Sequence, residues 1–401
     1  MIYIIPPFIV LLFILGVLER RKHQKNIHSL PVRVNVNGIR GKSTVTRLIT
    51  GILTEADYKT VGKTTGTQAR MLYWFDNNEE PIKRRHEGPN IGEQRKVVET
   101  AADLEADALV SECMAVNPDY QVVFQKQMLQ ANIGVIVNVL EDHMDVMGPT
   151  LDEVALSFTA TIPENGYLII NESPYVPYFK KIAEQRNTEV IVCDTSRVPE
   201  EYLLKFKYMV FPENAALALA VADALGIDED TAFKGMLNAW PDPGSMQITP
   251  IGSDEQSSSF LVNGFAANDA ASTINIWERV KMLGYPTEEP IVVMNCREDR
   301  VDRTEQFASD VLPHIPCKTL LLIGETTGPI VESYNKENIP ADYLLNLEGY
   351  STDEIVAELQ PHLDHSVIYG VGNIHGAAEP FVEALEELSM SSTKEEYKKW
   401  A

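Results

Sequence analysis

A glycine-rich segment near the N-terminus has the residue types that bind nucleotide phosphates. Residues 37–44 read NGIRGKST and lie between a β-type run, 32–37, and a helical run, 43–55. Glycines let backbone N–H groups approach phosphate oxygens, the helix adds the positive end of its dipole, Lys42 supplies a point charge and Ser43 can hold Mg²⁺. The other interpretation is an ordinary turn with an exposed lysine. We predict an ATP site formed by Gly38, Arg40, Gly41, Lys42, Ser43 and Thr44.

Three further segments place oxygen and nitrogen ligands at the ends of predicted strands, where open α/β sheets bind their ligands. Glu112 follows the run 108–111, His143 lies in NVLEDHMD (138–145), and two threonines follow the short run 60–61. A carboxylate at such a position suits Mg²⁺. Each segment alone also fits a solvated turn or a structural histidine. Together they predict a metal site formed by Ser43, Thr64, Thr65, Glu112 and His143.

These groups suit the activation of a carboxylate by ATP. A carboxylate acylates poorly because its leaving group would be oxide, whereas transfer of the γ-phosphoryl group makes an acyl phosphate that an amine can attack. This chemistry depends on positioning and on neutralising charge between two anions, and we assign it to Lys42, Glu112 and His143. A kinase would need the same loop but no amine site, so a second domain favours amide ligation.

Strand-like and helix-like segments alternate along the chain, as in helices packed on a mostly parallel sheet. Two prolines and a glycine at 240–244 (WPDPG) interrupt the alternation, which then restarts. We therefore predict an α/β fold in four parts. These are a membrane anchor at 1–25, a P-loop ATP-binding ligase domain with a parallel sheet at 26–240, a smaller doubly wound, Rossmann-like domain at 241–390, and a tail at 391–401.

The N-terminus predicts a transmembrane helix. Residues 2–18 carry no charge, and residues 19–25 read ERRKHQK. A helix of roughly 17 residues just spans a bilayer core, and a basic cluster on its C-terminal side places the rest of the chain in the cytoplasm. We expect a single-pass protein of the cell membrane with cytoplasmic catalytic domains. The alternative is a helix that docks on another subunit.

The overall charge excludes one class of partner. The formal net charge of the 401 residues is −24, and binding of nucleic acid requires clustered Lys and Arg. We therefore expect no nucleic acid partner. The four cysteines are far apart and form no C-x-x-C pair, so the sequence indicates reduced cysteines and neither a disulfide framework nor a zinc site.

The motifs at 38–44, Glu112 and 138–145 (N-x-x-x-D-H-M-D) resemble those of the bacterial Mur ligases and folylpolyglutamate synthases, which form amides through acyl phosphates. The resemblance implies ATP and Mg²⁺ on the residues above. It adds Asn214, which leads a helix that touches adenine in those families, and Asn90, in an N-I-G segment near the metal. The segment 263–269 replaces their D-x-x-H-N-P motif without its Asp and His, and supplies Asn263, Asn268 and Asp269.

Two features depart from the Mur ligases, which carry a modified lysine bridging the metals and a soluble N-terminal domain. Here residues 155–161 read ALSFTAT, without lysine, and the apolar segment replaces the domain. Both departures suit the catalytic subunits of capsule-type bacterial poly-γ-glutamate synthases, which residues 26–387 closely resemble in runs such as LPVRVNVNGIRGKSTVTRL and YGVGNIHGAAEP.

That resemblance implies the substrates and the partners. ATP phosphorylates the γ-carboxylate at the end of a growing poly-γ-glutamate chain, and the amine of a free glutamate, brought by the second domain, then attacks, releasing ADP and phosphate. Small integral-membrane subunits accompany the family, and we expect an oligomer.

An acidic protein needs local cations to bind glutamate and its polymer. Arg297, Arg300 and Arg303 are candidates, although they can instead pair with neighbouring acids on a solvated face. Other candidates lie beside the segment 88–92 or in the glycine-rich run 370–376, and these are Arg84, Arg85 and His375.

Three functions remain open from the sequence. The first is the polyglutamate ligase, and the second is another Mur-like ligase that joins an amino acid to a different acid. The third is a membrane-tethered P-loop ATPase or scaffold that serves a polymer export complex.

Overall fold

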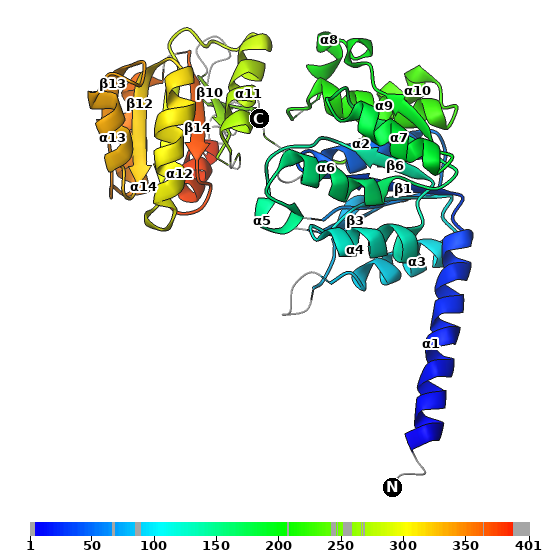
Figure 1. Cartoon of the computed structure of the whole chain (residues 1–401). Helices are drawn as coiled ribbons and strands as arrows, with labels where there is room; N and C mark the ends of the chain where they lie inside the picture. The colour runs from blue at the N-terminus through cyan, green and yellow to red at the C-terminus, as the bar shows by residue number, and fades with distance from the viewer. Residues whose placement is uncertain are drawn as a thin grey trace, which may run out of the picture. The chain divides into compact units, whose positions relative to one another are not determined.

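The computed structural model describes residues 5–65, 69–84, 90–206, 208–241, 246, 248–251, 259–265, 267, 269–363 and 365–387. They divide between two compact units: unit 1 covers Met1–Phe206 and Val210–Pro243, and unit 2 covers Lys207–Met209 and Gly244–Ala401. Each unit consists of one sheet with helices packed on both of its faces (Figure 1).

Unit 1 contains an eight-stranded sheet in the order β4-β3-β2-β5-β1-β6-β7-β8. Six of these strands are parallel, from β2 to β8 in this order, which confirms the predicted parallel sheet. The other two, β3 and β4, form an antiparallel edge that we did not predict. The central strands β1, β5 and β6 are buried on both faces, as parallel strands covered by helices are, although β1 (VRVNVN) alternates apolar with polar residues. The bounds are β1 Val32–Asn37, β2 Thr60–Lys63, β3 Arg70–Tyr73, β4 Asp76–Pro81, β5 Ala108–Glu112, β6 Ile133–Ile136, β7 Tyr167–Ile170 and β8 Glu189–Val192.

Helices cover both faces of this sheet (Figure 1). On one face α2 packs against α9 and α10, and on the other α3 and α4 pack with a π-helical segment, Phe124–Leu129. The second face is closed by a core that includes Val98, Leu109 and Phe124. The bounds are α2 Lys42–Glu55, α3 Glu93–Asp103, α4 Pro118–Val123, α5 Met144–Met147, α6 Leu151–Phe158, α7 Val176–Gln185, α8 Glu200–Leu203, α9 Pro212–Ala224 and α10 Glu229–Leu237.

Unit 2 contains a six-stranded sheet in the order β13-β12-β11-β14-β10-β9, parallel except for β9. Two separate cores, one around Trp277 and Phe307 and the other around Phe265 and Phe381, lie on its two faces. The bounds are β9 Ile248–Ile251, β10 Ser259–Asn263, β11 Ile291–Cys296, β12 Cys317–Gly324, β13 Ala341–Asn346, β14 Val367–Gly372, α11 Ala270–Met282, α12 Val301–Gln306, α13 Gly328–Asn335 and α14 Thr352–Leu359, with a further helix at 378–387.

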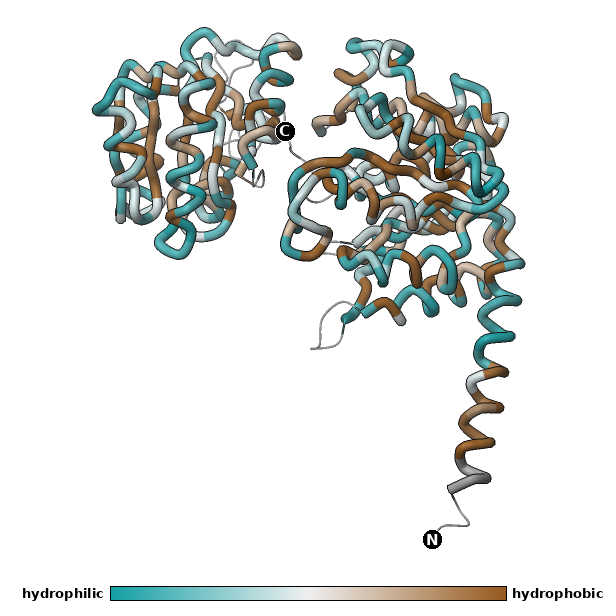
Figure 2. The backbone as a smooth tube through the Cα atoms, viewed as in Figure 1, coloured by the Kyte–Doolittle hydropathy of each residue, from teal (hydrophilic) through white to brown (hydrophobic). Residues whose placement is uncertain are grey.

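The helix α1 (Ile5–His28) combines an exposed apolar half with a docked polar half. Ile9 and Phe13 are 59% and 71% exposed, and Figure 2 shows this apolar stretch extending away from unit 1. The helix continues past residue 25, where we ended the anchor, because its last turns pack on α3. No helix among the described residues has both the length and the apolar character needed to cross a bilayer, so the predicted transmembrane span is unsupported.

The docked half of α1 is held by a buried histidine. The Nε2 atom of His23 lies 3.0 Å from the carbonyl oxygen of Met128 and 3.2 Å from that of Gln127. Burial lowers the pKa of His23 below its ordinary value, against the opposing effect of these two carbonyls. The folded protein therefore binds this proton less tightly than the unfolded chain does.

This difference in proton binding predicts a pH-dependent stability. As pH falls from about 7 to about 5, the unfolded chain takes up the proton first, so the contribution of His23 to stability decreases. His23→Gln cannot take up this proton, and its melting temperature should improve relative to that of the wild type over the same range. A difference between the two melting temperatures that does not vary with pH would contradict the prediction.

Candidate functional site

The candidate site of unit 1 lies where three neighbouring parallel strands end. β1 runs between β5 and β6, with Val36 opposite both Glu112 and Val135. Because the strands are parallel, the segments that follow them leave the sheet at the same edge. The phosphate-loop segment follows β1, Glu112 ends β5 and Asn138 lies just after β6, so three of the predicted segments are brought together as expected.

The backbone of the loop requires glycine, and Asn214 lies against it. Gly41 precedes α2 with φ of 81°, a left-handed conformation. A Cβ atom built on Gly41 would lie 2.8 Å from the Oδ1 atom of Asn214, a side chain that is nine-tenths buried near the start of α9. The predicted nucleotide residue Asn214 is thus adjacent to the loop, although far from it in sequence.

Asn138 fixes the shape of the loop, a role that we did not predict for it. Its Oδ1 atom accepts hydrogen bonds from the backbone N–H groups of Ile39 (3.1 Å) and Arg40 (3.0 Å), and its Nδ2 atom donates to the carbonyl of Arg40 (3.0 Å). The sequence did contain a signal for this role, because Asn138 is a polar residue just after an apolar strand. From the motif 138–145 we had selected only His143 as a site residue.

Glu112 joins two other segments of the site. It accepts hydrogen bonds from Ser43 Oγ (2.8 Å), from the backbone N–H of Thr65 (2.8 Å) and from Thr65 Oγ1 (2.5 Å). A carboxylate and two hydroxyls form a hard oxygen set, which fits a divalent cation such as Mg²⁺. Among the residues that the structure describes, no group of three or more His, Cys, Asp or Glu could hold a metal ion, so this set depends on its hydroxyls.

The other predicted residues of this edge lie in different surroundings. Lys42 donates to the carbonyls of Gly38 and Ile39. Thr64 accepts from the backbone N–H of Arg70 (3.2 Å) and so faces β3 rather than Glu112. Thr44 lies in the first turn of α2, and Asn90 accepts from the backbone N–H of Gly92 at the start of α3.

His143 is linked to the loop indirectly. It has φ of 51° at the start of α5, and its side chain is 52% exposed. The neighbouring carboxylate of Asp142 lies 3.2 Å from the guanidinium of Arg40, which ties the segment 138–145 to the phosphate loop. No hydrogen bond or ion pair between His143 and Glu112 is present among the described side chains.

Behind Glu112 lies a buried lysine, Lys63, to which we had assigned no role. Its ammonium is 3.5 Å from a carboxylate oxygen of Glu93, whose other oxygen is 3.1 Å from Nε of Arg84. Lys63 is fully buried. Burial lowers the pKa of its ammonium, while the carboxylates of Glu93 and Glu112 oppose that effect. Arg84, which we predicted to bind substrate, therefore belongs to a network of charged side chains behind Glu112.

In unit 2 most of the predicted residues gather where β10, β11 and β14 end. Asn263 is opposite Gly370, and Arg303 donates to the Oδ1 atom of Asn373 (2.8 Å). Asn295 donates to the carbonyls of Asn373 (2.5 Å) and His375 (2.9 Å), so two asparagines that we did not select organise this edge.

The remaining candidates of unit 2 are engaged locally. Arg297 pairs with Asp299 at 2.9 Å, which is the alternative that the sequence left open, and His375 Nδ1 lies 2.9 Å from Glu379. Asp269 accepts from the backbone N–H of Ser272 at the start of α11, and Arg300 is exposed before α12. Arg85 and Asn268 lie outside the described residues.

The hydrogen bonds of Asn138 predict a specific defect. Asn138→Ala leaves two loop N–H groups without their acceptor, and each such bond contributes about 1 kcal/mol. Two bonds amount to about 2 kcal/mol, so we expect the KM for ATP to rise by about thirtyfold in an ATPase or ligase assay, with a melting temperature lowered by only a few degrees. Asn132→Ala, which removes the same kinds of hydrogen bond to the backbone of Arg33 and Pro31 before β6, at the opposite edge of the sheet, is the matched control. An unchanged KM in Asn138→Ala would show that the loop keeps its shape without this side chain.

The buried network predicts a loss of stability. Lys63→Met leaves the carboxylates of Glu93 and Glu112 without their buried cation, and breaking such a pair costs about 3–5 kcal/mol. The double variant Lys63→Met/Glu93→Gln should recover part of the lost stability, because it removes the charge of one carboxylate that Lys63 no longer neutralises. Urea unfolding of the two variants measures both effects, and equal midpoints for Lys63→Met and the wild type would refute the network.

Comparison with known proteins identifies related sequences. Residues 248–388 match the poly-gamma-glutamate synthase CapB C-terminal domain, and residues 36–234 match the Mur ligase middle domain. The chain is 65% identical to the capsule biosynthesis protein CapB of Bacillus anthracis over 96% of this chain and 83% of that protein. It is 66% identical to the PGA synthase CapB of Bacillus subtilis, over 94% and 95% of the two chains.

Solved structures share the fold at low sequence identity. A bifunctional folylpolyglutamate synthase/dihydrofolate synthase of Yersinia pestis, complexed with AMPPNP and Mn ion, has a TM-score of 0.62 at 11% identity and covers 91% of this chain and 92% of its own. The UDP-N-acetylmuramoylalanyl-D-glutamyl-2,6-diaminopimelate–D-alanyl-D-alanyl ligase of Acinetobacter baumannii has a TM-score of 0.62 at 15% identity, over 94% and 79%. Together with the sequence relatives, these likenesses place the chain in the poly-gamma-glutamate synthase CapB family, which has the Mur ligase fold.

Proposed function

We propose that this chain is an ATP-dependent amide ligase that adds glutamate to the γ-carboxylate of a growing poly-γ-glutamate chain. The observation that carries the proposal is the junction of the phosphate loop with Glu112 through Ser43 Oγ at 2.8 Å, in a chain whose relatives are named PGA synthase and capsule biosynthesis protein. This junction brings the loop and the carboxylate of Glu112 to one edge of the sheet, which supports the roles that we propose for them.

The reaction proceeds in two steps. An oxygen of the acceptor γ-carboxylate attacks the γ-phosphorus of ATP, and the bond to ADP breaks, which leaves an acyl phosphate. The amine of glutamate then attacks the acyl carbon, phosphate leaves, and the nitrogen loses a proton to give the amide. ADP, phosphate and a chain one residue longer are the products.

The residues of unit 1 act on the first step. Backbone N–H groups of the loop, held in place by Asn138, bind the phosphates, and Lys42 provides a positive charge beside them. A divalent cation, which we propose is Mg²⁺, would be held by Ser43, Thr65 and Glu112 and would neutralise charge between the two anionic reactants. The Mn ion and AMPPNP of the related Yersinia pestis structure support a divalent metal and ATP.

We assign the binding of the incoming glutamate to the edge of unit 2 formed by β10, β11 and β14. Arg297, Arg300 and Arg303 bring three cations to this edge. Guanidinium groups suit carboxylates because they form two parallel hydrogen bonds. His375, beside the same edge, completes the set.

The exposed apolar half of α1 supports attachment to the cytoplasmic face of the cell membrane. Eight large apolar residues between Ile9 and Leu18 are about half exposed or more, and these are Ile9, Val10, Leu11, Leu12, Phe13, Ile14, Leu15 and Leu18. An exposed apolar surface of this kind is covered by lipid or by a partner. We propose that it holds the enzyme beside small integral-membrane subunits of an oligomeric synthase.

Hydroxylamine separates a ligase from an ATPase or scaffold. An acyl phosphate is trapped as a glutamyl hydroxamate, whereas a switch would hydrolyse ATP without forming one. We expect hydroxamate only when ATP and acceptor are both present, and a loss of at least about a hundredfold in Lys42→Ala and in Glu112→Ala, since each removes electrostatic stabilisation of the transferred phosphoryl group. The assay uses membranes that contain the full chain.

Matched controls and acceptors complete this test. Lys180→Ala and Glu184→Ala remove the same charges from exposed positions on α7, and they should keep full activity. Hydroxamate formation from an unrelated acid, without polyglutamate, would favour the second ligase hypothesis. ATP hydrolysis with no trapped acyl group under any condition would rule out the proposed function.

A further inference from the structure

A cavity of about 690 Å³ lies beside the candidate site in unit 1, between α3 and the antiparallel edge of the sheet. We call it the α3 groove. Its walls come from β3, the end of β4, the segment 82–84 and the outer side of α3. Met71, Ile82 and Val97 give it an apolar floor, and Lys83, Arg84 and Lys96 bring cations to its rim. Its size is that of an ordinary ligand site.

The inner end of the groove reaches the edge of the sheet that holds Glu112. Glu93 lines the groove and contacts Lys63, whose charge acts on Glu112. The next residue, Gln94, accepts a hydrogen bond from Ser111 Oγ (3.2 Å), one position before Glu112. The first turn of α3 therefore lies between the groove and the carboxylate of Glu112, and the groove begins at the same edge of the sheet as the candidate site.

The charges of the groove favour an anion. Lys83 and Lys96 are exposed, and neither has an ion-pair partner among the residues that the structure describes. Two acids line the groove: Glu93 is already neutralised by Lys63 and Arg84, and Glu80 accepts a hydrogen bond from Tyr73. In a chain with a net charge of −24, such a pair of unpartnered lysines over an apolar floor attracts a carboxylate-bearing ligand.

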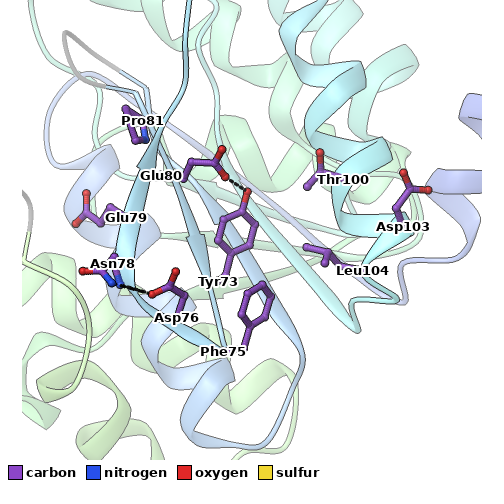
Figure 3. A pocket seen from close by; sticks show the side chains of 10 residues that line it. All are labelled: Tyr73, Phe75, Asp76, Asn78, Glu79, Glu80, Pro81, Thr100, Asp103 and Leu104. Atoms are coloured by element: carbon purple, nitrogen blue, oxygen red, sulfur yellow. Dashed lines mark hydrogen bonds between the residues drawn. The ribbon is translucent and has the colours of Figure 1, made fainter.

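The outer continuation of the groove has the opposite character. A neighbouring cavity of about 650 Å³ shares four lining residues with it, and these are Tyr73, Glu80, Pro81 and Thr100. Figure 3 shows the carboxylates of Asp76 and Glu80, from the strand β4, and of Asp103, from α3, around this second cavity, whereas that of Glu79 is paired with Arg47 and Arg70. Glu80 accepts a hydrogen bond from the hydroxyl of Tyr73 at 2.8 Å and so remains in place at the boundary. A polyanion is therefore attracted to the inner half and repelled from the outer half.

We propose that the α3 groove binds the acceptor polymer upstream of its reactive end, with Lys83 and Lys96 as its carboxylate contacts. This inference rests on the proposed function. Each residue of poly-γ-glutamate carries one free α-carboxylate and two methylene groups. The carboxylates match the lysines of the rim, and the methylenes match the apolar floor. The acidic outer cavity limits the binding to the few residues nearest the reactive end.

The proposal predicts that the enzyme distinguishes acceptors by length. A γ-glutamyl dimer ends before the groove, whereas a decamer fills it. Reversing the two charges in the double variant Lys83→Glu/Lys96→Glu should raise the KM for the decamer by about tenfold, from the loss of two exposed ion pairs and the added repulsion. The KM for the dimer should change by less than about twofold, and kcat should remain unchanged, because neither lysine contacts the reacting groups.

The measurement is extension of each oligomer by membranes that contain the full chain, with ATP and radiolabelled glutamate. Lys180→Glu/Lys181→Glu makes the same change of charge on α7, away from the groove, and should leave both KM values unchanged. Higher ionic strength should raise the decamer KM of the wild type more than that of the groove variant, since screening weakens only the contacts that exist.

The experiment distinguishes an error in the proposed acceptor site from an error in the proposed function. If the wild type extends oligomers but the groove variant keeps the wild-type KM for the decamer, the acceptor runs elsewhere and the ligase assignment stands. If the α7 control shows an equally large rise in the decamer KM, the change in net charge explains the effect. That result would also refute binding of the acceptor in the α3 groove. If the wild type extends neither oligomer, the proposed function itself fails.

Discussion

The parallel pairing of β1 between β5 and β6 is the constraint on which the candidate site depends. The register that sets Val36 opposite Glu112 on one side and Val135 on the other brings the phosphate loop between a carboxylate and an asparagine. Ser43 then reaches Glu112, and Asn138 reaches the loop backbone. A shift of one residue along β5 would turn the side chain of Glu112 to the other face of the sheet, away from Ser43.

A second constraint is the charge of the protein, because an acidic enzyme must handle anionic reactants. Unit 1 meets it by confining positive charge to a few places and by neutralising the acids nearest to them. Arg40 is paired with Asp142 beside the loop, and Lys63 and Arg84 enclose Glu93 behind it. The buried position of Lys63 matters most, since a cation in a poorly solvated site acts strongly on nearby carboxylates. The same arrangement leaves the exposed lysines of the α3 groove available to a ligand.

Unit 2 uses the same geometric principle with different residues. Its strands β10, β11 and β14 end together, and Asn295 and Asn373 connect their ends through backbone carbonyls. These buried amides hold the segments that carry Arg303 and His375. An arginine in α12 and a histidine after β14 are thus positioned by asparagines whose own role is structural. The amide groups are suited to this because each can both donate and accept.

Much of the site could be predicted from the sequence because its parts are local. A β-type run, a glycine-containing turn and a helical run specify a phosphate loop without reference to the rest of the chain, and a carboxylate at the end of an apolar strand is equally visible. The resemblance to ligase families supplied Asn214, and the structure places it against Gly41. The parallel sheets also followed from the alternation of strands and helices.

Only the tertiary structure decided the features that depend on pairing between distant segments. The antiparallel strands β3 and β4, the network of Lys63, Glu93 and Arg84, and the α3 groove all join residues whose proximity no local pattern encodes. The same holds for α1, which continues as a helix because residues near His23 pack on the body of unit 1. Local chemistry and periodicity are written along the chain, whereas burial, ion pairing and cavities arise when separate elements pack against each other.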